Sequence, residues 1–506
     1  MRKFLLNALL VLTALAFLPH PLLLAGTEFV QMNRSVIPRF TLDQAILTAL
    51  QRNADIQRAR EEIERTKGLY IALRAEALPR IDSTLSIQNT DPHLGSISTG
   101  SGGGLSGVPT QYSVSVQATQ VVFAGGRIVS QIRSASFQRD SAYYGFRNVI
   151  DQVIQTVKQQ FYQILLNRAL VGVQEESIKL LQSQLQDQTN RFEAGTVPRF
   201  NVLQAQVALS NQYPILITAQ NNYRIAQLQL AKTLGLDFDP ARGDGAPLEA
   251  VGELIYQPRR IPLEMAIELA KERRPFLKQQ KGTMLANAEQ VRIARAGYFP
   301  QLNVTAGEDF RSSPISENIE AVRSGYVFGG TGTWAIWDWG ATYGAVKQAT
   351  AILHQAQITY DDAVRQVELE VQQADSTVKQ SAELVKATDE SVGQAEEALR
   401  LASARLSAGA GTQLEVLDSR VQVTQAQSNR LQALYNYNTA LAEFDRVTAT
   451  EVTYANELDE PVTRAKLKTD ARPTPAPKPA PLELNHAGNR QPIQKTTRTR
   501  TTISGK

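Results

Sequence analysis

Hydrophobic residues recur every seven positions along two long segments of the chain. In the first segment the recurring positions are Ile150, Val157, Ile164, Val171, Ile178, Leu185 and Phe192. In the second they are Val364, Val371, Val378, Val385, Val392, Leu399 and Leu406. A strict seven-residue repeat drifts by about 20° per heptad on a straight α-helix, so a buried seam requires left-handed supercoiling. The pattern therefore predicts two long helices, each wound around neighbouring helices.

Each of these segments continues into a helical hairpin. The segments from Gly126 to Phe192 and from Gly340 to Leu406 each contain 67 residues, or roughly 100 Å of helix at 1.5 Å per residue. A short turn follows, and then a returning helix that ends near Leu234 or Val447. The candidate glycines of the two tip turns are Gly195, Gly409 and Gly411.

The whole plan occurs twice. At an offset of 221 residues, Leu42, Ala45, Ile46, Ala49, Arg52, Arg74, Ala75 and Pro79 recur as Leu263, Ala266, Ile267, Ala270, Arg273, Arg295, Ala296 and Pro300. At an offset of 214, Gly126, Arg191, Gly195, Val202, Leu203 and Tyr223 recur as Gly340, Arg405, Gly409, Val416, Leu417 and Tyr437. A register that holds over both halves predicts an internal duplication.

Strand signals lie between the duplicated helices. One amphipathic helix is predicted over Thr41 to Leu78 and its copy over Pro262 to Phe299, and the proline that follows ends each of them. Alternating apolar residues then mark two strands in each repeat: Ile81, Leu85 and Ile87; Tyr112, Val114, Val116, Ala118 and Val122; Leu302, Val304 and Ala306; Tyr326, Phe328, Trp334 and Ile336. The chain is therefore expected to supply four strands in two hairpins.

The first 25 residues are typical of a secretory signal peptide. Basic Arg2 and Lys3 precede the apolar run from Phe4 to Phe17, and small residues follow. The alternative is an N-terminal membrane anchor, but the run is shorter than the ~20 residues that span a bilayer. The sequence has no other apolar run of that length, so any further insertion into a membrane must use the strands.

Four strands are too few to close a barrel, and open strand edges are not tolerated in lipid. Two copies of the chain would give eight strands and a filled interior, whereas three would give twelve and leave a lumen. Aromatic residues gather where the strands meet the helices, as in a membrane-interface belt: Trp334, Trp337, Trp339, Tyr298 and Phe299. Aromatic packing at a soluble strand–helix junction is the alternative interpretation.

Composition and charge argue against several other classes of function. The chain has no cysteine, and His20, His93, His354 and His486 lack metal-ligand spacing, so we expect no metal site and no cofactor. The sequence has no phosphate-binding loop and no catalytic constellation, so we expect no enzyme activity. The segment from Pro461 to Lys506 contains ten basic and only two acidic side chains. The rest of the chain is acidic, which argues against nucleic-acid binding.

Two kinds of short segment recur in both halves. They are Phe123-Ala124-Gly125-Gly126-Arg127 with Trp337-Asp338-Trp339-Gly340, and Arg191-Phe192-Glu193-Ala194-Gly195 with Arg405-Leu406-Ser407-Ala408-Gly409. In their duplicated order, over about Thr41 to Val447, they resemble the TolC family of outer-membrane efflux proteins. The resemblance implies an α+β membrane protein: a homotrimer whose transmembrane β-barrel of about 12 strands, four per chain, continues into a long periplasmic α-helical coiled-coil barrel. It implies the outer membrane of a Gram-negative-type cell as the location, with most of the chain in the periplasm.

The resemblance also implies a function and partners. The chain would be the outer-membrane channel of a tripartite efflux or type I secretion system, a passive exit duct with a gated periplasmic tip. Its partners would be a periplasmic adaptor (membrane fusion) protein at the helical tips, an inner-membrane pump reached through the adaptor, and outer-membrane lipid. The competing function is that of a non-channel periplasmic coiled-coil structural or adaptor protein, which would not need tryptophan and tyrosine at strand ends.

Candidate gate residues follow from the same resemblance. Leu414 to Asp418 is similar to the family's tip segment, which implies that Glu415 and Asp418 face the constriction; as residues i and i+3 they share a helix face. Asn201 stands where a family acid often sits, and Gly411 where an arginine can stand. Two exposed carboxylates at a helix start are the alternative interpretation.

The expected organisation has five segments. They are a signal peptide (1–25), a first repeat (26–235), a linker (236–261), a second repeat (262–450) and a Pro-rich, basic, disordered tail (451–506).

Overall fold

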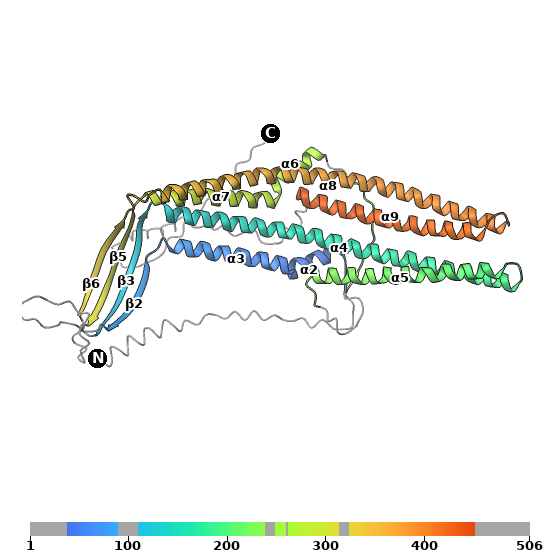
Figure 1. Cartoon of the computed structure of the whole chain (residues 1–506), viewed down its shortest axis with the longest axis horizontal. Coiled ribbons are helices and arrows are strands. Elements are labelled where there is room, and N and C mark those ends of the chain that lie inside the picture. Colours follow the sequence, from blue (N-terminus) through green and yellow to red (C-terminus); the bar gives the residue numbers. More distant parts are fainter. Residues whose placement is uncertain (1–37, 90–109, 238–247, 260–261, 313–322, 451–506) are drawn as a thin grey trace, which may run out of the picture. The chain divides into compact units, whose positions relative to one another are not determined.

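The computed structural model describes residues 38–89, 110–237, 248–259, 262–312 and 323–450 (Figure 1). The expected signal peptide, the tail and the two hairpin loops lie outside the described residues. All described residues belong to one compact unit, which ends at Glu451.

The order of elements is the same in the two halves of the chain, except for a short 3-10 helix, η3, in the second half (Figure 1). The first half contains β1 (Arg39–Phe40), α2 (Leu42–Arg52), α3 (Ala54–Ala75), β2 (Arg80–Asn89), β3 (Thr110–Ala124), α4 (Arg127–Glu193) and α5 (Arg199–Thr233). After β4 (Glu249–Ala250), the second half contains α6 (Leu263–Arg273), α7 (Pro275–Arg295), η3 (Ala296–Tyr298), β5 (Gln301–Ser312), β6 (Arg323–Thr333), α8 (Ala341–Ser407) and α9 (Gln413–Thr448). Two helices, a hairpin, a long helix and a returning helix thus occur twice.

The prediction of one continuous helix at the start of each repeat was wrong. Asn53 separates α2 from α3, and Arg274 separates α6 from α7; both have extended backbone, with ψ of 131° and 121°. The side chain of Asn53 caps α3, because it accepts hydrogen bonds from the backbone of Asp55 and Ile56. Arg274 precedes a proline, and sterics disfavour the helical conformation before proline.

The two long helices have the predicted length. α4 and α8 each contain 67 residues, and each begins directly after a glycine, Gly126 or Gly340. The buried positions of the heptad seams include Ile150, Val157, Ile164, Val371 and Val385. The seam therefore faces neighbouring helices, as the seven-residue period requires.

Four strands form one antiparallel sheet in the order β2-β3-β5-β6 (Figure 1). This arrangement confirms two hairpins, and the contact of β3 with β5 joins them. The last strand was predicted to include Trp334 and Ile336, which is wrong, because β6 ends at Thr333. No further strand of the described chain lies beside β6, so the residues after it have no ladder to join.

A second, two-stranded sheet was not predicted. In it β1 pairs in parallel with β4. The segment around β4 falls in the expected linker and is held against the helices. Arg168 of α4 donates to the carbonyl oxygen of Ala250 at 2.8 Å, and the hydroxyl of Tyr437 of α9 donates to that of Gln257 at 2.5 Å. Residues 248–259 therefore contact helices of both halves.

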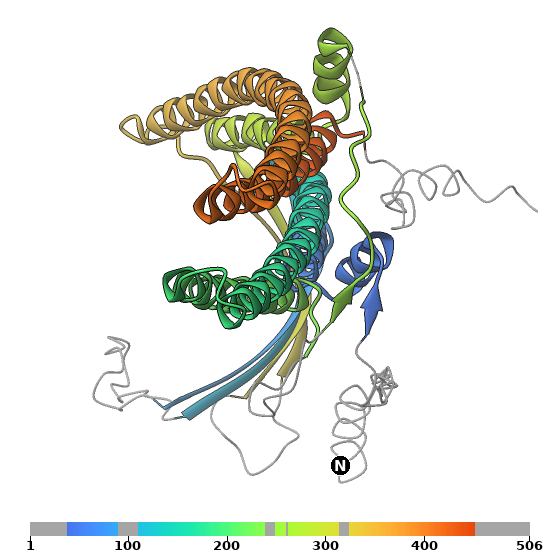
Figure 2. The ribbon, with the colours of Figure 1, turned by 90° about the vertical axis from the view of Figure 1, so that its right-hand side faces the viewer.

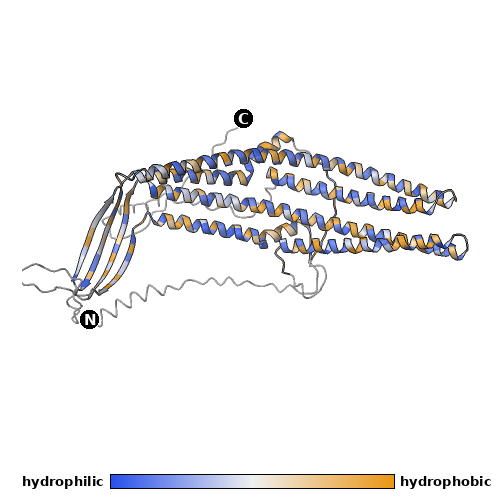
Figure 3. Ribbon diagram, in the orientation of Figure 1, coloured by the Kyte–Doolittle hydropathy of each residue, from blue (hydrophilic) through white to orange (hydrophobic). Residues whose placement is uncertain are grey.

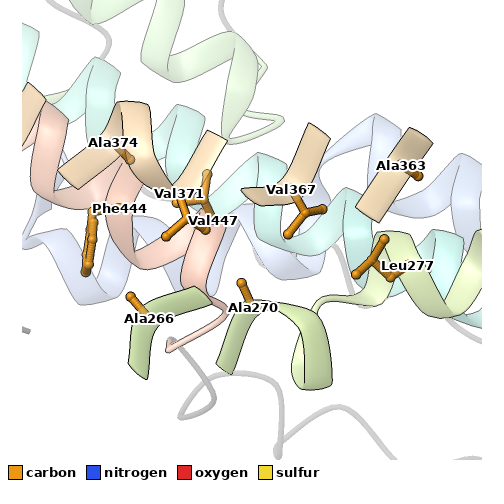
Figure 4. Packing of buried hydrophobic residues seen from close by; sticks show 9 residues of the cluster. All are labelled: Ala266, Ala270, Leu277, Ala363, Val367, Val371, Ala374, Phe444 and Val447. Atoms are coloured by element: carbon orange, nitrogen blue, oxygen red, sulfur yellow. The ribbon is translucent and has the colours of Figure 1, made fainter. Parts of the chain in front are cut away.

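The helices pack laterally in pairs. Figure 2 shows α4 beside α5 and α8 beside α9, and the helices of each pair are in contact. Helices α6, α7, α8 and α9 enclose a buried apolar cluster (Figure 4): Ala266, Ala270, Leu277, Ala363, Val367, Val371, Ala374, Phe444 and Val447. Four of the nine are alanines, so the helices approach closely, since the distance between helix axes depends on the side chains at the contact.

The equivalent helices α4 and α8 have unequal surroundings. α4 contacts α3 and α5 of its own half and also α7 and α9 of the other half. α8 contacts α6, α7 and α9, but among the described residues it makes no comparable contact with α3 or α5. One side of α8 thus lacks the neighbours that α4 has.

Candidate functional site

The four-stranded sheet has one apolar and one polar face. Residues that lie opposite each other across the strands share a face, and successive residues of a strand alternate. The apolar face carries Ile81, Leu85, Ile87, Val114, Val116, Ala118, Leu302, Val304, Ala306, Phe310, Tyr326 and Phe328, with Ser83, Gln120, Glu308 and Ser324 as exceptions. The polar face carries Asp82, Thr84, Ser86, Ser113, Ser115, Gln117, Thr119, Asn303, Thr305, Asp309, Arg311, Thr331 and Thr333, with Val121, Ala124 and Val327 as exceptions.

The apolar face is exposed in the single chain. Large apolar side chains are exposed at both edges of the sheet: Ile81, Leu85 and Ile87 at one edge, and Tyr326 and Phe328 at the other. Among the described elements, no helix packs across this sheet. An uncovered apolar surface of this extent indicates contact with lipid or with another protein.

The predicted interface aromatics come together where the sheet meets the helices, and all five are exposed: Trp334, Trp337, Trp339, Tyr298 and Phe299. Trp334 donates its indole N–H to the carbonyl oxygen of Tyr298 at 3.1 Å. The rings of Trp337 and Trp339 meet edge to face, with centroids 5.7 Å apart. Their gathering at one end of the strands agrees with an interface belt.

Both tip turns contain a glycine in the left-handed conformation. Gly195 and Gly409 have φ of 73° and 72° and follow the last turns of α4 and α8. After Gly409, the N–H of Ala410 donates to the carbonyl oxygen of Arg405 at 2.9 Å, and the first tip turn has the equivalent bond. These are Schellman caps, in which glycine is favoured because it has no Cβ.

The two candidate gate carboxylates are exposed in the first turns of α9. Thr412 is the N-cap, and its hydroxyl accepts a hydrogen bond from the N–H of Glu415 at 3.3 Å. The Nε of Arg405 lies 3.9 Å from a carboxylate oxygen of Glu415. Gln422 donates to Asp418 at 2.9 Å. Glu415 and Asp418 therefore share an exposed face near a helix N-terminus, where negative charge is favoured.

Asn201 and Gly411 differ in their relation to these carboxylates. Asn201 lies in the first turn of α5, on the other helical hairpin, and no hydrogen bond links it to Glu415 or Asp418 in the described part of the chain. Gly411 lies in the second tip turn, where a Cβ would come within 3.0 Å of the Cβ of Arg405. The N-cap role of Thr412 was not predicted, although Thr three residues before Glu is a typical N-cap signal.

A buried ionic cluster that was not predicted joins α4, α8, α9 and the break before α7. Arg274 is 5% exposed and forms an ion pair with Glu370, and Arg446 lies 3.8 Å from the same carboxylate. Burial raises the pKa of Asp151 to about 6, although Arg147, Arg446 and Arg274 oppose the shift. These residues are far apart in sequence, so no local pattern pointed to them.

Two features are absent from the described residues. These residues contain no group of three or more His, Cys, Asp or Glu residues that could hold a metal ion. They also contain no helix that is long and apolar enough to cross a membrane. Figure 3 shows why, since hydrophobic and hydrophilic positions are mixed along every helix.

Comparison with known proteins places this arrangement in a class. The family model described as outer membrane efflux protein matches residues 45–236 and 266–450. The matched residues are more than half of the chain. The chain therefore belongs to the outer membrane efflux protein family.

Individual relatives are distant. The chain is 24% identical to TtgC of Pseudomonas putida, a probable efflux pump outer membrane protein, over 307 residues, which are 58% of this chain and 57% of TtgC. The match thus spans little more than half the length of that relative. The chain is 26% identical to the outer membrane protein TolC of Escherichia coli over 198 residues, 37% of this chain and 38% of TolC. The CmeC outer membrane channel of Campylobacter jejuni has the same fold, with a TM-score of 0.71 at 16% identity over 80% of this chain and 85% of CmeC.

Proposed function

We propose that the chain is the outer-membrane channel of a tripartite efflux or type I secretion system. Three copies would form a passive exit duct from the periplasm to the exterior. The strands would build a transmembrane β-barrel of about 12 strands, and the helices would continue it as a periplasmic coiled-coil barrel. The observation that carries the proposal is the exposed apolar face of a four-stranded sheet whose edge strands, β2 and β6, lack a second neighbour in the described chain.

Lipid explains both features of the sheet. An apolar face costs free energy in water and none in hydrocarbon, and the polar face suits a water-filled lumen. In lipid each unpaired backbone group of an edge strand would cost several kcal/mol, so the edges must be closed by further copies. Two copies would give a filled barrel, and three are the smallest assembly that leaves a lumen.

The helices support the same assembly. Leu203 of α5 and Leu417 of α9 are equivalent in the two repeats, yet Leu203 is 49% exposed and Leu417 is 9% exposed. Within the chain α9 contacts α4, whereas α5 has no comparable contact with α8 among the described residues. A second copy that placed its α8 beside α5 would supply the missing neighbour and bury Leu203.

The organisation of the chain follows from this role. Residues 1–25 direct export, residues 26–235 and 262–450 are two structural repeats joined by 236–261, and 451–506 form a basic tail. The protein lies in the outer membrane of a Gram-negative-type cell, with most of the chain in the periplasm. The exposed helical tips contact a periplasmic adaptor, and through it an inner-membrane pump, which supplies the energy of transport.

The tip acts as the gate of the duct. Three copies bring Glu415 and Asp418 together as a ring of negative charge at the constriction, which admits cations in preference to anions. Asn201, in the first turn of the neighbouring hairpin, approaches this ring across the subunit boundary. The tip glycines Gly195, Gly409 and Gly411 keep the turns narrow.

The competing function is a soluble periplasmic scaffold or adaptor. A soluble scaffold would be destabilised by an uncovered apolar sheet face and by five exposed aromatic residues at its end, because both features favour aggregation in water. The channel function accounts for both features and for the two open edges.

Biochemistry on the full chain separates these two functions. We expect extraction from the outer membrane to require detergent, native mass spectrometry to give a trimer, and the purified protein to conduct ions in planar bilayers. Extraction without detergent as a monomer would contradict the channel and favour the scaffold.

A further inference from the structure

The two β-hairpins have the same register. Arg80 lies opposite Thr119 in the first hairpin, and Gln301 lies opposite Thr333 in the second. The numbers differ by 221 between Arg80 and Gln301 and by 214 between Thr119 and Thr333, which are the offsets of the sequence repeat. β2 therefore corresponds to β5, and β3 to β6, residue by residue.

The contact between β3 and β5 is a seam between equivalent hairpins. Ala118 lies opposite Ala306 there, and beyond a bulge at Val122 the pairing continues to Ala124 opposite Gln301. The free edges of the sheet are β6, the equivalent of β3, and β2, the equivalent of β5. A second copy can thus join its β2 to this β6 by the geometry that the seam already uses, in a head-to-tail contact that forms rings.

The segment after β6 lacks a partner that its equivalent has. β3 contains 15 residues and β6 contains 11. The last residues of β3, from Gln120 to Ala124, pair with β5 alone, because β2 begins opposite Thr119. Their equivalents, Trp334 to Asp338, are not in a strand within the chain. The β2 edge of a neighbouring copy would give these residues the ladder they lack.

We propose that β6 and Trp334–Asp338 of one copy pair antiparallel with β2 of a second copy in a single defined register. The register follows from the seam between β3 and β5, in which Ala118 lies opposite Ala306. The repeat offsets convert this pair into Gly332 opposite Leu85 of the second copy. Beyond a bulge at Ile336, they set Asp338 opposite Arg80. This inference rests on the proposed trimeric barrel and names the residue pairs that close it.

The side chains agree with this register. It puts Leu85 and Ile87 of β2 on the same face as Phe328 of the neighbouring β6, so the apolar face continues from copy to copy. A slip by one residue would set these apolar side chains beside the polar face, because successive side chains of a strand alternate. The register also brings the opposite charges of Arg80 and Asp338 together at the end of the contact, and such cross-strand pairs are favourable.

Disulfide cross-linking in the outer membrane tests the register without background, since the sequence has no cysteine. The variant Ser86→Cys/Thr331→Cys places its cysteines directly opposite each other between copies. Opposite residues of antiparallel strands have Cα atoms about 4.5–5.5 Å apart, within the range of about 4.4–6.8 Å that disulfides span. We expect oxidation to convert the protein to covalent trimers. Thr84→Cys/Thr333→Cys is an independent pair with the same expectation.

Matched controls move one cysteine by two positions on the same face. They are Ser86→Cys/Thr333→Cys and Ser86→Cys/Gly329→Cys. Diagonal neighbours across antiparallel strands lie about 7–8 Å apart, beyond the range of a disulfide. We expect these controls to cross-link roughly tenfold more slowly than the matched pairs.

Native mass spectrometry of the reduced variants separates failure of the register from failure of the channel. Faster cross-linking of both matched pairs in trimers supports the register. Trimers in which a shifted pair reacts faster, or in which no pair reacts, overturn the register and leave the trimeric duct standing. A wild-type chain that is monomeric would overturn both proposals.

Discussion

Gly125 and Trp339 have the same left-handed backbone conformation, with φ of 59° and 55°, at equivalent positions of the two strand–helix turns. The glycine that follows each of them, Gly126 or Gly340, is left-handed as well. A side chain in this conformation costs roughly 1–2 kcal/mol. The first turn cannot hold a side chain, because a Cβ on Gly125 would lie 2.8 Å from the Cβ of Phe299. The second turn holds Trp339, which is 90% exposed, so its side chain has room there and would lie at the membrane interface of the proposed channel.

The substitution Gly125→Ala should therefore destabilise the protein more than Gly126→Ala. Both changes place alanine at positive φ, with a cost of roughly 1–2 kcal/mol. At position 125 the new methyl group also meets Phe299 and lies 2.9 Å from the carbonyl oxygen of Ala296, whereas at 126 it has nothing within 4 Å. Thermal unfolding followed by circular dichroism measures the difference. Equal losses in the two variants would show that the first turn relaxes around the added group.

Tryptophan fluorescence should report only on the strand–helix junction, because the three tryptophans of the chain, Trp334, Trp337 and Trp339, all lie there. In the proposed channel this junction lies at the membrane interface. In liposomes we expect strong quenching by lipids brominated close to the headgroup and weak quenching by lipids brominated at the chain end. Trp339→Phe should lower the total emission and keep this depth preference. Efficient quenching by aqueous acrylamide, with no effect of brominated lipid, would contradict the interface assignment.

The long helices and the sheet could be predicted because their signals are local and repeated. The heptad seam gave the length of α4 and α8, and the alternation in the strands gave both hairpins. The junction aromatics were predicted as a group for the same reason, since strand ends are visible in the sequence. The break at Arg274 was also readable, because Pro275 follows it.

The remaining contacts could not be predicted because they join distant positions. Two-residue strands such as β1 and β4 have no periodicity, and Arg39 and Glu249 are 210 residues apart. Asp151, Arg274 and Glu370 meet in one buried cluster, yet a lone charge on a helix usually indicates a solvated face. Tertiary packing determines these contacts, and no short segment of the sequence contains a pattern that predicts them.

Removal of both tip carboxylates should weaken the cation preference of the channel. In the proposed trimer, Glu415 and Asp418 supply the negative charge of the constriction. We expect small, cation-preferring conductance at rest, and Glu415→Ala/Asp418→Ala should conduct more and discriminate little between ions. Reversal potentials in planar bilayers under a salt gradient measure this. Glu415→Gln/Asp418→Asn is the matched control that removes charge and keeps volume; ion preference unchanged in both variants would show that the gate assignment is wrong.

Loss of Arg405, beside the gate, should change the conductance of the channel much less than loss of the two carboxylates. Arg405 lies 3.9 Å from Glu415, and both side chains are exposed. Exposed ion pairs contribute only about 0–1 kcal/mol. We therefore expect Arg405→Ala to change the resting conductance by less than about fivefold. A fully open channel after this single change would mean that the pair locks the tip in the assembled trimer.

Replacement of Asp151 should make the stability of the protein less dependent on pH. Burial raises the pKa of Asp151 from 3.8 to about 6 in the folded chain, against the opposing charges of Arg147, Arg446 and Arg274. Between these two values the folded state binds the proton and the unfolded state does not, so the contribution of Asp151 to stability falls as pH rises through about 4 to 6 and is lowest above that window. Asp151→Asn, which is always neutral, should therefore raise the unfolding midpoint near neutral pH and change it little near pH 4. Asp140→Asn, which removes an exposed carboxylate from the same helix, is the matched control and should shift the midpoint little at either pH. Thermal unfolding across this pH range decides the matter, because an effect of Asp151→Asn that is equal at both ends would exclude titration of Asp151 as its cause.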